Sequence, residues 1–154
     1  MKTTQLIETA RFGTIEFCDA DLVTLAEGIL GFPGQTRYLV IQHKEGSPFC
    51  WLQSADDGAL AFLVVDPAYY VPDYAPELPD ETARQLELGE ETPRLVYTIV
   101  TIPKGKPDDM TLNLAGPILI NLEKRLAKQV VVEDVRYAIR HRVFPKEEMG
   151  QTAA

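Results

Sequence analysis

The sequence predicts a mainly β protein: a small antiparallel β-barrel-like domain with one or two short helices. In residues 95–102, odd-numbered and even-numbered side chains fall on opposite faces, as in a strand. Residues 60–65 and 130–132 are continuously apolar, which is typical of central strands in a closed or sandwiched sheet. Residues that break strands divide these runs at the short intervals of small β folds.

Turn residues separate the predicted strands. Pro33 sets φ near −65°, and Gly34 then takes the positive φ of a type II turn after Phe32. Residues 55–58 and 103–107 are predicted to be hairpin connections, because Asp-Asp-Gly and Pro-Lys-Gly-Lys-Pro interrupt the apolar runs there.

Two asparagines bracket a second kind of interruption near the C-terminus. Asn113 and Asn121 flank an apolar run broken by Gly116 and Pro117, which predicts two short strands joined where the backbone turns or bulges. We expect both amides to satisfy backbone groups at this interruption, a structural role.

The centre of the chain is rich in proline. Four prolines in residues 67–79 exclude a helix or a central strand there. Asp80 is then predicted to cap a short helix that runs through Leu88 and stops at Gly89. Residues 137–143 fit both a strand and a helix, because their apolar positions recur with both periods.

Length and composition indicate a single domain. The chain has 154 residues and 45% hydrophobic residues, so residues 1–145 are expected to form one β domain and the polar residues 146–154 a frayed tail. Cys18 and Cys50 are expected to be free, buried or half-buried thiols. Neither an N-terminal signal run nor a membrane-length apolar run occurs, which favours the cytoplasm.

Acidic residues concentrate in residues 66–91, where eight carboxylates face Arg84 alone, a net charge of −7. Such a field repels phosphate backbones and attracts a basic partner, so direct nucleic-acid binding is not expected. The alternative interpretation is a solvated acidic loop with no partner.

A search for chemistry gives no catalytic or metal-binding constellation. His43 and His141 are not at ligand spacing from any cysteine or histidine, so we expect neither a metal nor another cofactor. The adjacent carboxylates at 56–57, 90–91 and 108–109 have the character of solvated turns. Two alternatives stay open: a hydrolase or isomerase, marked by two carboxylates converging in an apolar cleft with a raised pKa, and a ligand-binding barrel, marked by an internal apolar cavity.

Aromatic residues suggest where a partner docks. Trp51 lies in an apolar strand and is interpreted as a core residue, with an interface anchor as the alternative. Tyr69, Tyr70 and Tyr74 lie among prolines and carboxylates, and form either a docking surface or a loop that packs back on the barrel.

The order of several short motifs resembles the FliW family of flagellar assembly factors over about residues 6–144. The matching pieces are FGTIEF at 12–17, GILGFPG at 28–34, PFCWLQS at 48–54, LAFLVVDP at 60–67, TLNLAGPILIN at 111–121, KQVVV at 128–132 and YAIRH at 137–141. Gly116 departs from the pattern, since the family more often has a small residue with a side chain there.

The resemblance implies a non-enzymatic β-barrel-like domain that binds flagellin before export. When released, such a protein binds and antagonises the carbon storage regulator CsrA, an RNA-binding translational repressor. It either covers the basic RNA surface as a phosphate mimic or, as the family favours, binds elsewhere and shifts CsrA toward a state with lower RNA affinity. The residues expected to contact partners are Tyr70, Asp73, Tyr74, Glu77, Asp80 and Glu81. The family motif assigns structural roles to Gly31, Phe32, Pro33, Gly34, Trp51, Asn113, Pro117, Asn121 and Gln129.

Overall fold

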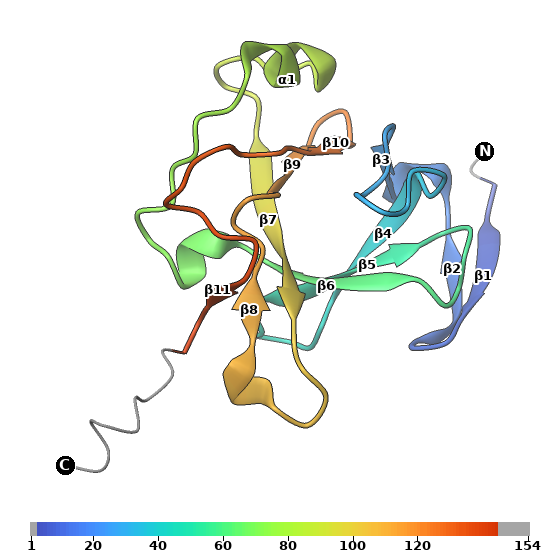
Figure 1. Ribbon diagram of the computed structural model, residues 1–154. Coiled ribbons are helices and arrows are strands. Elements are labelled where there is room, and N and C mark those ends of the chain that lie inside the picture. Colours follow the sequence, from blue (N-terminus) through green and yellow to red (C-terminus); the bar gives the residue numbers. More distant parts are fainter. Residues whose placement is uncertain (1–2, 145–154) are drawn as a thin grey trace.

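The computed structural model describes residues 3–144, so the tail predicted for residues 146–154 lies outside the described part. Strands dominate (Figure 1). They are β1 Gln5–Thr9, β2 Gly13–Phe17, β3 Leu22–Leu25, β4 Arg37–Gln42, β5 Phe49–Ser54, β6 Ala61–Val65, β7 Arg94–Thr101, β8 Thr111–Leu112, β9 Ile118–Asn121, β10 Leu126–Gln129 and β11 His141–Arg142. One α-helix, α1 Asp80–Gln85, and the 3-10 turns Asp19–Asp21, Pro67–Tyr69 and Pro107–Asp109 complete the described elements.

Seven strands close into a barrel in the order β7-β6-β5-β4-β3-β10-β9, with β9 returning to β7. The length of β7 permits this closure, because its first half pairs with β9 and its end pairs with β8, which carries β11 outside the ring. All pairings are antiparallel except β3 with β10, which is parallel. The predicted β-barrel class is therefore confirmed, with one parallel joint.

Inward-facing side chains fill the barrel. Leu95, Tyr97 and Ile99 share the interior cluster, as the alternation predicts. The other residues of this cluster are Val23, Leu25, Ile29, Tyr38, Val40, Cys50, Leu52, Phe62, Val64, Ile118, Ile120 and Ala127. The fold is thus built around a packed interior.

Two further apolar clusters cover the outside of the barrel. The β1–β2 hairpin lays Ile7 and Ile15 on Leu39 of β4. Gly58 allows the hairpin to come close, since the N–H of Ala10 donates to its carbonyl at 2.9 Å and a Cβ at Gly58 would overlap the hairpin backbone. The third cluster lies on the outer face of β6, β7 and β8, beneath residues 66–79 and 137–143.

Several local predictions are wrong. Residues 130–132 are not a central strand: they follow β10 outside any assigned strand, and Val131 is 60% exposed. Gly31 adopts a positive φ of 92°, whereas Gly34 does not. The prolines do not exclude every helix, because Pro67 begins a 3-10 turn at a first position that needs no N–H donor.

The predicted helix is shorter than expected. It ends at Gln85 and not at Leu88, since Glu87 has a left-handed φ of 54°. Asp80 is the first helical residue, and Pro79 occupies the cap position without a side-chain hydrogen bond. The ambiguous residues 137–143 contribute one short strand, β11, which pairs with β8.

Candidate partner-binding surface

Residues 66–79, here called the proline strap, cross the outside of the barrel beside β7 and β9. Asp66 starts the strap by accepting a hydrogen bond from the N–H of Ala68 at 2.9 Å. The hydroxyl of Tyr74 donates to the carbonyl of Leu114 at 2.6 Å, and the N–H of Ala75 donates to the hydroxyl of Tyr137 at 3.0 Å. These bonds order a segment that has no regular sheet pairing.

Of the three tyrosines in the strap, two pack against the barrel and one is exposed. Tyr70 and Tyr74 are half-buried in the outer cluster, where the Tyr74 ring meets Tyr137 edge to face at 4.6 Å between centroids. Burial raises the pKa of Tyr74, so its hydroxyl stays a protonated donor at neutral pH. Tyr69 is 63% exposed and forms the outward part of the aromatic group. Tyr70 and Tyr74 therefore offer a partner only part of their rings.

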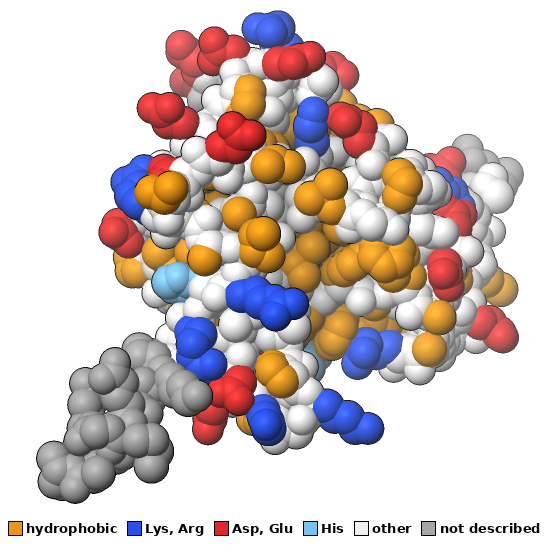
Figure 2. All heavy atoms as spheres, viewed as in Figure 1, with side chains coloured by type: hydrophobic (Ala, Val, Ile, Leu, Met, Phe, Trp, Pro, Cys, Tyr) orange, Lys and Arg blue, Asp and Glu red, His pale blue; other side chains and the backbone are white. Residues whose placement is uncertain are grey.

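The four acidic residues expected to bind a partner all lie at the surface. Asp73 and Glu77 belong to the strap, and Asp80 and Glu81 begin α1. None of them forms a salt bridge with a residue in the range 3–144. Figure 2 shows acidic side chains gathered around α1, at the top of the view. The structure thus presents these carboxylates to solvent without a direct ion pair to a described residue, although Asp73 is close enough to Arg136 to add slightly to the rise in the arginine pKa that Asp134 mainly causes.

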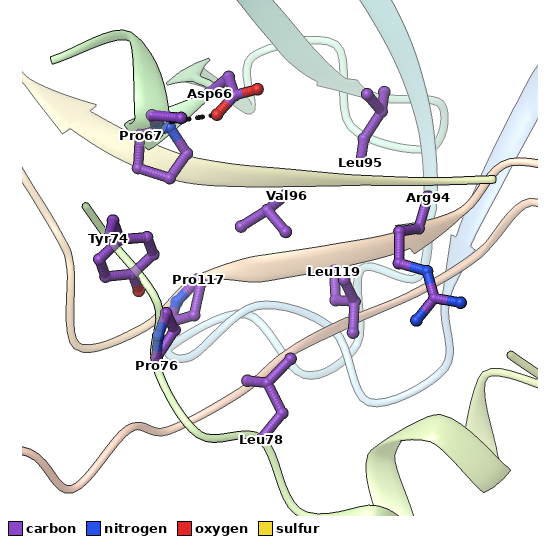
Figure 3. Close-up of a pocket in the computed structure, with 11 residues that line it drawn as sticks. Asp66, Pro67, Tyr74, Pro76, Leu78, Arg94, Leu95, Val96, Pro117 and Leu119 are labelled. Atoms are coloured by element: carbon purple, nitrogen blue, oxygen red, sulfur yellow. Dashed lines mark hydrogen bonds between the residues drawn. The ribbon is translucent and has the colours of Figure 1, made fainter. Parts of the chain in front are cut away.

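An apolar cavity of about 340 Å³ lies beneath the strap, between it and the outer side of β7 and β9 (Figure 3). Pro67, Tyr74 and Leu78 of the strap face Val96 and Leu119 across it. Arg94 lies at the end opposite Pro67, where its guanidinium is held by the carbonyls of Thr92 and Gly89. The cavity is an external groove and not an internal ligand chamber.

Two carboxylates have a lowered pKa, the opposite of the raised pKa that marks a general acid. Arg37 holds the pKa of Asp56 below its ordinary value, chiefly through a hydrogen bond, and Arg136 does the same to Asp134. Residues 3–144 contain no group of three or more side chains that could hold a metal ion.

Gln129 joins two segments of the family motif that are distant in sequence. Its Oε1 accepts from the N–H of Leu30 at 2.8 Å, and its Nε2 donates to the carbonyl of Gly116 at 3.1 Å. A Cβ on Gly116 would lie 2.9 Å from the amide nitrogens of both Gln129 and Asn113. Glycine therefore leaves room for this bridge between the 28–34 loop and the interruption before β9.

Asn121 is fully buried and fixes the connection after α1. Its Nδ2 donates to the carbonyls of Leu86 at 2.7 Å and Glu87 at 3.2 Å. Its Oδ1 accepts from the N–H groups of Glu123 at 2.9 Å and Lys124 at 3.0 Å. The amide thus holds the left-handed residue that ends the helix, and also shapes the β9–β10 turn.

Trp51 is half-buried on the outside of β5, so the prediction of a core position is wrong. The guanidinium of Arg11 lies 3.9 Å above its ring, and its Nε1 donates to Nδ1 of His43 at 3.2 Å. The cause is strand alternation: Cys50 and Leu52 point into the barrel, so Trp51 points out. Phe12 of the β1–β2 hairpin connection packs against it edge to face.

Sequence reasoning missed two exposed apolar residues near the acidic surface. Leu30 is 66% exposed in the 28–34 loop, and Val131 is 60% exposed after β10. Both border a hollow that also reaches Glu81 and Gln129. Their apolar character suggested burial. Only the rule that successive side chains of an extended chain point to opposite sides could have indicated that Val131 turns outward between the buried Val130 and Val132.

No helix within residues 3–144 is long and apolar enough to cross a membrane.

Comparisons with known proteins agree with this architecture. The model of the FliW protein family matches residues 5–143. The flagellar assembly factor FliW of Desulfitobacterium hafniense strain Y51 is 38% identical over 146 residues, which cover 95% of each chain. That of Syntrophus aciditrophicus is 42% identical over 142 residues, covering 92% of this chain and 89% of the relative.

A crystal structure of the flagellar assembly factor FliW superimposes with a TM-score of 0.85 at 37% sequence identity, covering 94% of this chain and all of the other. The likeness in sequence and in fold spans both the barrel and the strap. The chain therefore belongs to the FliW family of flagellar assembly factors.

Proposed function

We propose that this chain binds flagellin in the cytoplasm before export and, when released, binds and antagonises CsrA, so that flagellin synthesis follows secretion. It acts by binding and not by catalysis. The observation that supports this proposal is the ordered acidic surface of the strap and α1, whose carboxylates lack salt bridges with described residues, in a member of the FliW family.

Charge complementarity is the physical basis of the proposed recognition of CsrA. CsrA is expected to present a basic surface, and complementary potentials raise the rate of encounter and orient the partners. Antagonism by binding away from the RNA surface requires that the chain bind the state of CsrA with low RNA affinity more tightly than the other state. The acidic surface then supplies encounter and orientation, while this difference in affinity supplies the antagonism.

The apolar groove beneath the strap supports protein binding through apolar contacts as well as through charge. Its walls are proline, leucine and valine side chains with few polar atoms, a chemistry suited to apolar side chains of a protein partner. Tyr69 adds an exposed aromatic ring to the strap itself.

A pulldown from flagellated cells with this chain as bait tests the function directly. Recovery of both flagellin and CsrA is expected, and recovery of neither would refute the proposal. Association kinetics with purified CsrA, measured across a salt series, then test the role of charge. The variant to compare with the wild-type chain carries lysine at Asp73, Glu77, Asp80 and Glu81.

A matched control changes the net charge equally at exposed positions elsewhere, with lysine at Glu8, Glu16, Glu45 and Asp108. The strap variant is expected to associate more slowly than this control at low salt, and the two rates are expected to converge as salt rises, because the Debye length is about 10 Å at 0.1 M. Equal rates at every salt concentration would reduce the acidic residues to a solvated loop.

A further inference from the structure

Beyond Ala127, β10 has no described strand paired with it on the β3 side. β3 pairs with β10 only through Leu126 and Ala127, and its chain then leaves the sheet after Leu25. The chain after β10 nevertheless stays extended, since the N–H of Val130 donates to Pro117 and that of Val132 to Ala115, both at 2.8 Å. After β10 ends at Gln129, the chain therefore keeps a strand-like pairing with residues 115–117 on one side.

The other side of this segment is open. Backbone groups of a strand point alternately to its two neighbours, so those of Val131 point away from the residues that receive Val130 and Val132. No backbone hydrogen bond joins Val131 to any residue between 3 and 144. We call residues 129–133 the open edge. It is the kind of strand edge that accepts a further strand from another chain.

Space for such a strand lies along the open edge. A hollow of about 520 Å³ is enclosed by the 28–33 loop, the start of α1 and residues 128–131. A second hollow, of about 760 Å³, lies between residues 77–79 and residues 131–136. Both border Pro79 and Val131, so together they run along the edge. The exposed Leu30 and Val131 provide apolar contacts within this path.

The charges along this path have one dominant sign. Two carboxylates are neutralised locally, Glu27 by Lys128 at 3.0 Å and Asp134 by Arg136 at 2.7 Å. The remaining three, which form no salt bridge with a described residue, are Glu77, Glu81 and Glu133. A bound segment therefore meets apolar side chains on its path and uncompensated negative charge on both walls.

We propose that the open edge binds an extended, basic segment of a partner protein as an added β-strand. Its backbone pairs with Val131, its apolar side chains contact Leu30 and Val131, and its lysines or arginines face Glu77, Glu81 and Glu133. This inference rests on the proposed function in placing a protein partner at the acidic surface. It adds the conformation and the chemistry of the segment that is recognised.

An added strand explains features that a docked helix does not use. A helix satisfies its own backbone groups and would leave those of Val131 unpaired, whereas a strand supplies the missing donors and acceptors. The alternation of a strand also suits the path, because successive side chains can meet the apolar floor and the acidic walls in turn.

A short capped peptide of alternating lysine and valine is the probe. Added to the ¹⁵N-labelled full chain, it is expected to shift the backbone amide signals of residues 129–133 with saturation at or below about 1 mM, and to slow hydrogen exchange at Val131. Two control peptides have glutamate in place of lysine, or N-methylated valines that cannot donate a hydrogen bond. Neither is expected to bind.

Variants separate the edge from general electrostatics. Glu81→Gln with Glu133→Gln is expected to weaken binding of the lysine–valine peptide about threefold or more. The matched pair Glu8→Gln with Glu16→Gln, on the exposed β1–β2 hairpin, is expected to leave it unchanged. Equal weakening by both pairs would overturn the proposal.

Other outcomes also overturn it. These are the absence of saturable binding, shifts that map outside residues 129–133, undiminished binding of the N-methylated peptide, or occupation of the edge by a second copy of this chain, seen as concentration-dependent dimerisation. The experiment uses neither flagellin nor CsrA. Its failure therefore leaves the proposed function standing, and failure of the pulldown leaves the peptide site standing.

Discussion

Replacing Asn121 with alanine tests the connection between the barrel and the acidic surface. The substitution removes two hydrogen bonds that Nδ2 donates, to the carbonyls of Leu86 and Glu87. It also removes two that Oδ1 accepts, from the N–H groups of Glu123 and Lys124. A neutral hydrogen bond contributes about 1 kcal/mol net, and a buried group left unpaired costs about 1–3 kcal/mol. Glu87, Glu123 and Lys124 are exposed and their backbone groups can regain water, so the carbonyl of buried Leu86 dominates the cost.

We therefore expect Asn121→Ala to lower the free energy of unfolding by about 3 kcal/mol. For a chain of this length, 1 kcal/mol corresponds to about 2–4 °C, so the melting temperature is expected to fall by about 6–12 °C. Urea unfolding followed by circular dichroism measures the free energy directly.

Asn113→Ala is the matched control, because this asparagine is half-buried and accepts one hydrogen bond, from the N–H of Ala115 at 3.1 Å. Its expected cost is about 1 kcal/mol. A cost below about 1 kcal/mol for Asn121→Ala, or one no larger than that of Asn113→Ala, would refute the reasoning. Unchanged stability together with lost partner binding would make Asn121 a contact residue.

Three further predictions concern the barrel and its cover. Gly58→Ala is expected to destabilise the chain by about 1–3 kcal/mol in urea, because the new Cβ overlaps the hairpin backbone; an unchanged midpoint would contradict the close approach. Arg37 lowers the pKa of Asp56, so their pairing stabilises the fold above the unfolded value near 3.8 and is lost as pH falls through the folded pKa. Asp56→Asn should therefore cost about 0.2–1 kcal/mol at neutral pH and nothing in acid, and a cost that persists in acid would count against it. Burial raises the pKa of Tyr38 to about 12 and also raises that of Tyr97, so stability should fall as pH rises from 10.0 toward 12; ultraviolet titration showing every tyrosine ionised by about pH 11 in folded protein would contradict this.

The sequence predicted the strand content well where side-chain alternation is strong. In β7, Leu95, Tyr97 and Ile99 enter the barrel as predicted, since a strand places successive side chains on opposite faces wherever it lies. Continuous apolar composition, a different criterion, correctly indicated a strand at residues 60–65. It failed for residues 130–132, because apolar composition alone does not show whether both faces of a segment are covered.

The candidate site was predictable in composition but not in arrangement. The acidic excess of residues 66–91 and the prolines of the strap can be read from the sequence, and the carboxylates lie at the surface while Pro67 is buried. The packing of Tyr74 against Leu114 and Tyr137 could not be read, since these residues are far apart in the chain. The outward position of Trp51 also depends on which face of β5 the barrel encloses.

By itself, then, the sequence determined local properties: strand periodicity, the sites of turns, the acidic segment and the motifs shared with the FliW family. Tertiary structure decided the closure of β9 on β7, the parallel joint of β3 with β10, and the open edge that follows this joint. The physical reason is that pairing register and burial arise from contacts between distant segments. A backbone hydrogen bond or an apolar contact of this kind leaves no periodic signal in either segment alone.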